Sequence, residues 1–436
     1  MAITQYQLVL DSFLAQKAKN YKTSDMKGLL IDLQANILKS HRKKYVVHAF
    51  IHLYPNEVDK AKAWLRKLDI SSALAQLEER YNSKKNKSQK NTDILTNIYL
   101  SHDGYEYLGY DLRKFPESGA MPFSGNPQSR TALNLNMEEG KLPYHNKIHL
   151  LLTFAGNSKK QLREVLKDSL EEADIKAYNN NKKEFPPVKR RIGHAFIQWG
   201  ESKEVGPFGF TDKTSNPLFF PNPQKTEDPK SSNFISDDDI SALSTVLVKD
   251  PNGDNWNSCG SFLAFMKLRQ DVKAFKKASK KIEKTTESDA DFAKGLIMGK
   301  LPNDIVKGDV YLSQNKGCPM HKSHIEAAKM GSKSYAPITR RSINYRDSKD
   351  NQGLLFMSFQ ANIKYQFENL ISRFITNRSE LMVDPLLYDH GLKPSIDFHF
   401  PTKDRNDSIV QFETPFVTLQ KGWYFFAPSI SSIKKI

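Results

Sequence analysis

The sequence predicts an α+β protein with two similar domains whose sheets are mainly antiparallel, and three observations support this prediction. Strand-length apolar runs alternate with amphipathic helical segments in each half of the 436-residue chain. A single hydrophobic core rarely grows beyond about 250–300 residues, so this length favours more than one domain. Neither half carries the glycine-rich phosphate loop of a nucleotide-binding parallel sheet, which favours antiparallel strands.

In the first half, Tyr45–Tyr54 alternates and is rich in β-branched and aromatic residues, which predicts a strand. The other elements predicted here are helix Val58–Leu68 continuing to Leu77, strand Ile94–Leu100, a helix capped by Ser101 and running to Leu108, strand Ile148–Ala155 and helix Ser158–Glu171. The polar tract of residues 84–91 predicts an exposed loop.

The second half repeats this alternation, although its sequence identity to the first is too low to define a repeat. Its predicted elements are strand Gly260–Leu268, helix Asp271–Ile282, strand Leu354–Gln360, helix Ile363–Phe374 and a closing strand Trp423–Ala427. The segment from Asn222 to Asp239 is rich in Pro, Asn and Asp, so we place the domain boundary there, between residues 1–225 and 226–436.

The composition and charge argue against a disordered protein and against a nucleic-acid-binding protein. With 39% hydrophobic and 11% aromatic residues the chain has material for a buried core and is not a disordered protein. The formal net charge is +16, but the lysines cluster in polar segments without interleaved aromatic residues. This pattern favours solvated surfaces and predicts no nucleic-acid partner.

Two cysteines, Cys259 and Cys318, provide no disulfide framework, which favours a reducing cytoplasm. No apolar run approaches the roughly 20 residues that span a bilayer, so no membrane association is expected. Met1–Asn20 lacks a basic leader with a cleavage site and predicts an amphipathic helix instead. A homo-oligomer is compatible with the sequence, which does not determine the oligomeric state.

The densest group of ligand-type side chains is Cys318, His321 and His324, spaced Cys-x-x-His-x-x-His. Thiolate and imidazole are zinc ligands, but a structural zinc site needs a fourth ligand, and no second Cys/His pair follows at finger spacing. A haem iron needs only one of these histidines. Histidines without any metal are the third interpretation.

Two further motifs carry chemistry. Asp212 lies in Pro207-Phe-Gly-Phe-Thr-Asp-Lys-Thr-Ser-Asn-Pro217, either at the rim of a cavity or as the cap of its own turn. Arg340 and Arg341 are adjacent, so in an extended chain they project to opposite sides. One of them can therefore enter a pocket.

Together these motifs resemble the dye-decolourising haem peroxidases in order and separation. The resembling segments are Phe208–Asp212, Ser323-His324-Ile325 and Ile338-Thr-Arg-Arg341. Weaker likenesses extend over nearly the whole chain: Leu33–Lys39, Asn97–Tyr105, Gly260–Val272, Gly353–Gln360 and Gly422–Ser429.

The resemblance implies two ferredoxin-like domains whose sheets enclose a b-type haem (iron protoporphyrin IX). By position, His324 is the axial iron ligand, Asp212 the distal acid–base residue and Arg340 the distal cation, while Leu354 and Phe356 line the peroxide pocket. The first domain then supplies the aspartate loop and the second supplies His324 and Arg340. His321 lacks the Ser-His-Ile context of the family, so it is not expected to bind the iron.

The implied activity is a peroxidase that reduces hydrogen peroxide and oxidises a small or bulky organic donor, such as a dye or phenol, through compound I. A carboxylate can move the proton between the peroxide oxygens, and a guanidinium stabilises the charge that develops. The axial imidazole gains electron density if a carboxylate accepts its other N–H, and Asp384, Asp407 and Glu413 are the candidates.

The chain departs from the family pattern in two places. Lys213 follows the aspartate where the family has glycine, and Ile325–Met330 replaces a usually basic segment. The ammonium of Lys213 could pair with Asp212 and impair its acid–base exchange. Two alternative functions therefore stay open: a haem carrier or sensor with little turnover, and a basic nucleic-acid-associated protein without haem.

Overall fold

The structure is a computed structural model. It describes residues 24–85, 94–115, 123–125, 147–179, 191–211, 219, 242–298, 302, 338–371, 386, 395–401 and 407–436. The predictions for Met1–Asn20, for the loop beyond residue 85 and for the boundary at Asn222–Asp239 lie outside these residues.

The first half contains the predicted alternation of strands and helices. Its elements are α2 (Ser24–Asp32), β1 (Tyr45–Leu53), α3 (Val58–Lys67), α4 (Ala73–Lys85), β2 (Leu95–Leu100), α5 (His102–Tyr107), η1 (Leu112–Lys114), β3 (Leu150–Gly156), α7 (Lys159–Glu172), β4 (Ile175–Asn179) and β5 (Gly193–Glu201). The Ser101 hydroxyl accepts from the Gly104 N–H and caps α5, as expected. The helix predicted to continue to Leu77 is instead interrupted, because Ser72 pairs with Gln34 before α4 begins.

The second half is richer in strands than the sequence indicated. Its elements are η4 (Ala242–Thr245), β6 (Val248–Lys249), β7 (Cys259–Gln270), α8 (Val272–Thr286), α9 (Ala290–Met298), β8 (Thr339–Arg340), β9 (Ile343–Arg346), β10 (Gln352–Gln360), η6 (Ile363–Glu368), β11 (Ile396–Pro401), β12 (Asp407–Phe412), β13 (Val417–Ala427) and α14 (Ile430–Lys434). Asp271 caps α8 by accepting from the Ala274 N–H.

The strands form one 11-stranded sheet that closes on itself, apart from the separate β11–β12 hairpin. In the first half the order is β2-β3-β1-β5, and in the second it is β9-β10-β7-β13. Each order corresponds to the ferredoxin-like βαββαβ arrangement, and among the described strands only β4 and β5 form a parallel pair. The fold is therefore α+β with two ferredoxin-like units, as predicted.

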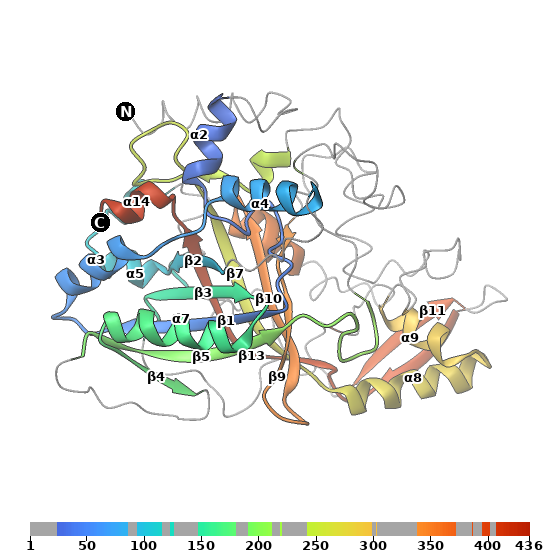
Figure 1. Cartoon of the computed structure of the whole chain (residues 1–436). Helices are drawn as coiled ribbons and strands as arrows, with labels where there is room; N and C mark the ends of the chain where they lie inside the picture. Colours follow the sequence, from blue (N-terminus) through green and yellow to red (C-terminus); the bar gives the residue numbers. More distant parts are fainter. Residues whose placement is uncertain are drawn as a thin grey trace.

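The two units meet through very short pairings. Phe426 of β13 pairs with Leu100 of β2, and Glu201 of β5 pairs with Asn344 of β9. The fourth strand of each unit thus joins the second strand of the other, which closes the ring. In Figure 1, α7 lies along the outside of β1, β3 and β5, whereas α8, α9 and β11 lie beside the second unit.

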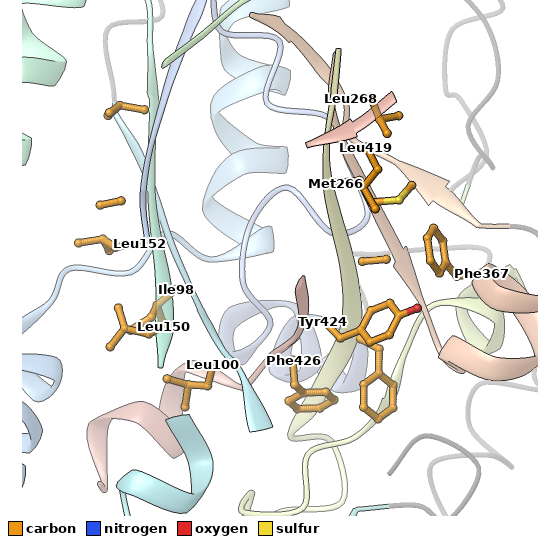
Figure 2. Close-up of a cluster of buried hydrophobic side chains, with 14 of the residues drawn as sticks. Ile98, Leu100, Leu150, Leu152, Met266, Leu268, Phe367, Leu419, Tyr424 and Phe426 are labelled. Atoms are coloured by element: carbon orange, nitrogen blue, oxygen red, sulfur yellow. The ribbon is translucent and has the colours of Figure 1, made fainter. Parts of the chain in front are cut away.

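The inside of the ring is filled by side chains from both units. Phe50 of β1 contacts Phe265 of β7 with ring centroids 5.0 Å apart, and Tyr99 of β2 contacts Phe359 of β10 at 5.8 Å. Successive residues of a strand project to opposite faces, so a second apolar set lies outside the ring. Figure 2 shows part of this outer set, with Ile98 and Leu150 on one unit and Met266 and Tyr424 on the other. Among the described residues, no helix is both long and apolar enough to span a bilayer.

Candidate active site

Arg340 lies at the end of a row of residues that crosses four strands. It is opposite Ser358 of β10, Ser358 is opposite Ala264 of β7, and Ala264 is opposite Tyr424 of β13. Directly opposed residues of antiparallel strands project from the same face. Tyr424 belongs to the apolar set outside the ring, so the whole row lies there. We call this side of β8, β10, β7 and β13 the outer face of the second sheet.

Leu354 and Phe356 project from the same outer face, because they share the alternation of Ser358 along β10. Both are half-buried, whereas the residues opposite them on β7, Met266 and Leu268, are 1% and 8% exposed. The Phe356 ring packs against Phe367 of η6 at 6.1 Å. The structure therefore brings three predicted site residues, Arg340, Leu354 and Phe356, onto one partly open apolar face.

The two adjacent arginines project to opposite sides, as predicted. Arg341 is 5% exposed, and its guanidinium donates to the carbonyl oxygens of Asn36 at 2.6 Å, Ile37 at 2.7 Å and Arg340 at 2.8 Å. Burial lowers the pKa of Arg341 to about 9, so it is still a cation at neutral pH. Arg341 thus ties the short strand that carries Arg340 to the loop after α2.

The loop that leads to Asp212 is anchored on the second unit. Phe208 stacks on Phe275 of α8 with centroids 4.3 Å apart, and Thr211 donates its N–H to the Pro302 carbonyl at 3.2 Å. Gly209 has a φ of +91°, which a residue with a side chain adopts only with strain. The chain is therefore fixed up to the residue before Asp212.

Several predicted residues lie outside the part of the chain that the structure describes. These are Asp212, Lys213, Cys318, His321, His324 and Asp384. Asp407 is the first residue of β12, and Glu413 is exposed, with its carboxylate 3.6 Å from the Lys281 ammonium. The identity of the acid behind the axial histidine stays a prediction.

The sequence did not indicate one pair of polar residues on this face. The Tyr424 hydroxyl donates to the Glu368 carboxylate at 3.0 Å, and the two residues are 1% and 6% exposed. Strand alternation could have placed Tyr424 with Phe426 on one face of β13. Nothing in the predicted helix Ile363–Phe374 marks its glutamate as buried.

Among the described residues, His102, Asp103 and Glu106 have ligand atoms close enough to hold a metal ion. The Lys147 ammonium lies 3.0 Å from the Asp103 carboxylate and 3.9 Å from that of Glu106, so these acids already have a cationic partner. We assign no metal site to them.

Comparison with known proteins relates this chain to the DyP-type peroxidases. A family model described as "Dyp-type peroxidase, C-terminal" matches residues 207–387, a range that contains Arg340, Leu354 and Phe356. The fold of a DyP-type peroxidase from Anabaena covers 96% of this chain and 98% of its own, with 25% identity and a TM-score of 0.76. The family model and this solved structure both describe DyP-type peroxidases, and the chain resembles them in the sequence of residues 207–387 and in fold over nearly its whole length.

Other DyP-type peroxidases show a similar likeness. The multifunctional dye peroxidase DyP2 of Amycolatopsis is 25% identical over 285 residues, which are 52% of this chain and 60% of that relative. Its solved structure covers 95% of this chain with a TM-score of 0.73 and 21% identity. The fold of a fungal DyP-type peroxidase from Auricularia auricula-judae covers 93% of this chain, with a TM-score of 0.66 and 16% identity.

Proposed function

We propose that this chain is a haem-dependent peroxidase that reduces hydrogen peroxide and oxidises an organic electron donor. The observation that carries the proposal is the strand register, which puts the Arg340 guanidinium on the same face as Leu354 and Phe356. This face combines apolar side chains with the Arg340 cation. That combination suits a flat apolar macrocycle whose reactive face must stabilise an anion.

The residues on this face fit haem b. Leu354 and Phe356 are only half-buried, so a bound macrocycle would cover apolar surface that they still expose. Side chains from both units fill the inside of the ring, so we place the haem on the outer face of the second sheet. His324 is our proposed axial ligand, and Asp384, Asp407 and Glu413 stay the candidates for the acid that orients it.

Bound haem supplies the iron that binds hydrogen peroxide; the protein side chains do the rest. With haem bound, the Asp212 carboxylate would act as the acid–base group that moves a proton between the two oxygens of hydrogen peroxide. The Arg340 guanidinium stabilises the negative charge that develops as the O–O bond lengthens, and it stays protonated throughout. Leu354 and Phe356 exclude bulk water, which strengthens both interactions.

The same proposal assigns roles to the two units. Residues 1–225 contribute the aspartate loop, and residues 226–436 contribute His324, Arg340 and the apolar face. The partners are hydrogen peroxide and a small or bulky organic reductant. We also propose a cytoplasmic location, on the grounds that two cysteines form no disulfide framework and that Cys259 is a free, buried thiol.

A haemin titration of the purified protein tests the site. The wild type should develop a Soret band, and Leu354→Glu, which places a charge against the macrocycle, should weaken haem binding by at least about tenfold. Ile409→Glu is the matched control, because Ile409 is 57% exposed on the separate hairpin. Equal haem binding by Leu354→Glu and wild type would show that the haem binds elsewhere.

A second candidate function, a haem carrier with little turnover, rests on Lys213. This ammonium follows Asp212 directly, where the family has glycine, and could hold the carboxylate in an ion pair. Adding peroxide and a phenolic donor to the loaded protein separates the candidates. Sustained donor oxidation supports the peroxidase, and a Soret band with negligible turnover supports the carrier.

A further inference from the structure

Tyr424 and Glu368 form a buried pair that the proposed peroxide chemistry does not use. The phenol donates to the carboxylate at 3.0 Å. The two residues come from different elements, the closing strand β13 and the π-helical turn η6. A buried carboxylate is costly unless it is paired, and single π-helical turns occur frequently at functional sites. Both observations favour a functional role for the pair of Tyr424 and Glu368.

The pair lies on the face that we assign to the haem. Tyr424 is in the same cross-strand row as Arg340, separated from it by the small residues Ser358 and Ala264. Three strand spacings of about 4.8 Å put the two α-carbons roughly 14 Å apart. Phe367 lies between the pair and Phe356, with its ring 5.9 Å from that of Tyr424 and 6.1 Å from that of Phe356. Figure 2 shows the Tyr424 and Phe367 rings beside one another on this side of the sheet.

Phenol oxidation explains why a carboxylate would be placed here. A phenol that loses an electron becomes a very strong acid, so oxidation of a buried tyrosine is favourable only where a base can take the proton. Glu368 is such a base, already hydrogen-bonded to the phenolic oxygen. Two other buried tyrosines lack this arrangement: the Tyr105 hydroxyl has no hydrogen-bond partner among the described residues, and that of Tyr345 donates to the amide oxygens of Asn351 and Gln420.

We propose that Tyr424 and Glu368 are a redox-active pair that passes single electrons to the haem. Tyr424 gives one electron to the haem that peroxide has oxidised, and its phenolic proton moves to Glu368, leaving a neutral tyrosyl and a protonated carboxyl. An organic donor then returns one electron to Tyr424 while Glu368 returns the proton. Both residues are restored, and the donor has lost one electron. The inference rests on the proposed function.

Electron paramagnetic resonance of the haem-loaded protein, frozen shortly after mixing with hydrogen peroxide, tests the pair. Ring-deuterated tyrosine identifies a tyrosyl signal by the change in its hyperfine splitting. The wild type should give this signal and Tyr424→Phe should not. Glu368→Gln keeps an oxygen that accepts from the phenol but loses the base, so the signal should form about a hundredfold more slowly, the lower end of what a general base contributes.

Tyr345→Phe is the matched control. Tyr345 is also buried, but it lies inside the ring, with the Lys267 ammonium 4.5 Å from its ring centre. A cation there disfavours the loss of an electron, so this variant should keep the wild-type signal.

The outcomes separate this inference from the proposed function. If peroxide leaves the Soret absorption of the loaded wild type unchanged, the proposed function fails, and the pair fails with it. If the Soret absorption responds but the wild type gives no tyrosyl signal, or Tyr424→Phe keeps it, the pair alone is wrong. A Glu368→Gln signal that forms as fast as in the wild type would likewise overturn the proton transfer, because a merely structural hydrogen bond survives this change.

Discussion

Three histidines whose rings lie in contact at one end of the ring of strands predict that stability falls steeply in mild acid. His52 of β1 and His194 of β5 are directly paired, with ring centroids 5.0 Å apart, and the His149 ring lies 4.8 Å from that of His52. His149 and His194 are 6% and 1% exposed. Burial, and then the neighbouring His52, lower the pKa of His149 to about 3 and that of His194 to about 4.

The sign of the effect follows from these lowered pKa values. As pH falls below the ordinary histidine pKa of 6.5, these histidines bind protons in the unfolded chain but stay neutral in the folded protein. The stabilisation is therefore complete above pH 6.5 and is lost progressively towards pH 3–4. Each pH unit costs about 1.4 kcal/mol per histidine, so His149 alone removes up to about 2 kcal/mol between pH 6.5 and pH 5.

His149→Asn tests this assignment. The imidazole Nδ1 accepts from the Leu53 N–H at 2.8 Å, which an asparagine side-chain oxygen can also do. The variant should be less stable at pH 7.5, because its ring contact with Tyr107 is lost. It should then lose up to about 2 kcal/mol less than the wild type between pH 6.5 and pH 5. Urea unfolding at a series of pH values measures this difference, and parallel pH curves for the two proteins would refute the reasoning.

Three further predictions concern the axial ligand, the net positive charge and the lysine that follows Asp212. His324→Ala should lose haem while His321→Ala keeps it; the reverse result would move the axial ligand to His321. Mobility-shift assays at roughly physiological salt should show no tight DNA or RNA binding, because most lysines of α8 are exposed and no aromatic ring among the described residues lies against them; binding that weakens steeply with salt would contradict this. Lys213→Gly should react faster with peroxide if the ammonium holds Asp212 in an ion pair. A slower reaction would show that Lys213 assists the reaction with peroxide.

The sequence correctly predicted those strands and helices that show strict alternation or a capping residue. The alternation of Tyr45–Tyr54 became β1, and the Ser101 and Asp271 caps start helices where they were expected. Strand β5, Gly193–Glu201, escaped notice because its burial pattern is nearly continuous, so alternation does not mark it. The short strands β8 and β9 depend on pairing with β10, which sequence periodicity cannot reveal.

In the candidate site, too, some features follow from the local sequence and others depend on contacts between distant segments. The opposite directions of Arg340 and Arg341 follow from local strand geometry and could be predicted. The alignment of Arg340 with Leu354 and Phe356 depends on the register between two strands, which the motifs suggested only through resemblance. The Tyr424–Glu368 contact joins residues 56 positions apart, and no local signal encodes it.

The reaction of Arg340→Leu with hydrogen peroxide tests the central claim most directly. Wild type and variant are loaded with haem to equal Soret absorbance, and stopped-flow spectra give the rate at which peroxide changes that absorbance. Loss of one charge-stabilising donor should slow the reaction by about 10²–10³-fold while haem stays bound. Equal rates in the two proteins would contradict the assignment of Arg340, and of the face it shares with Leu354 and Phe356, to the peroxide site.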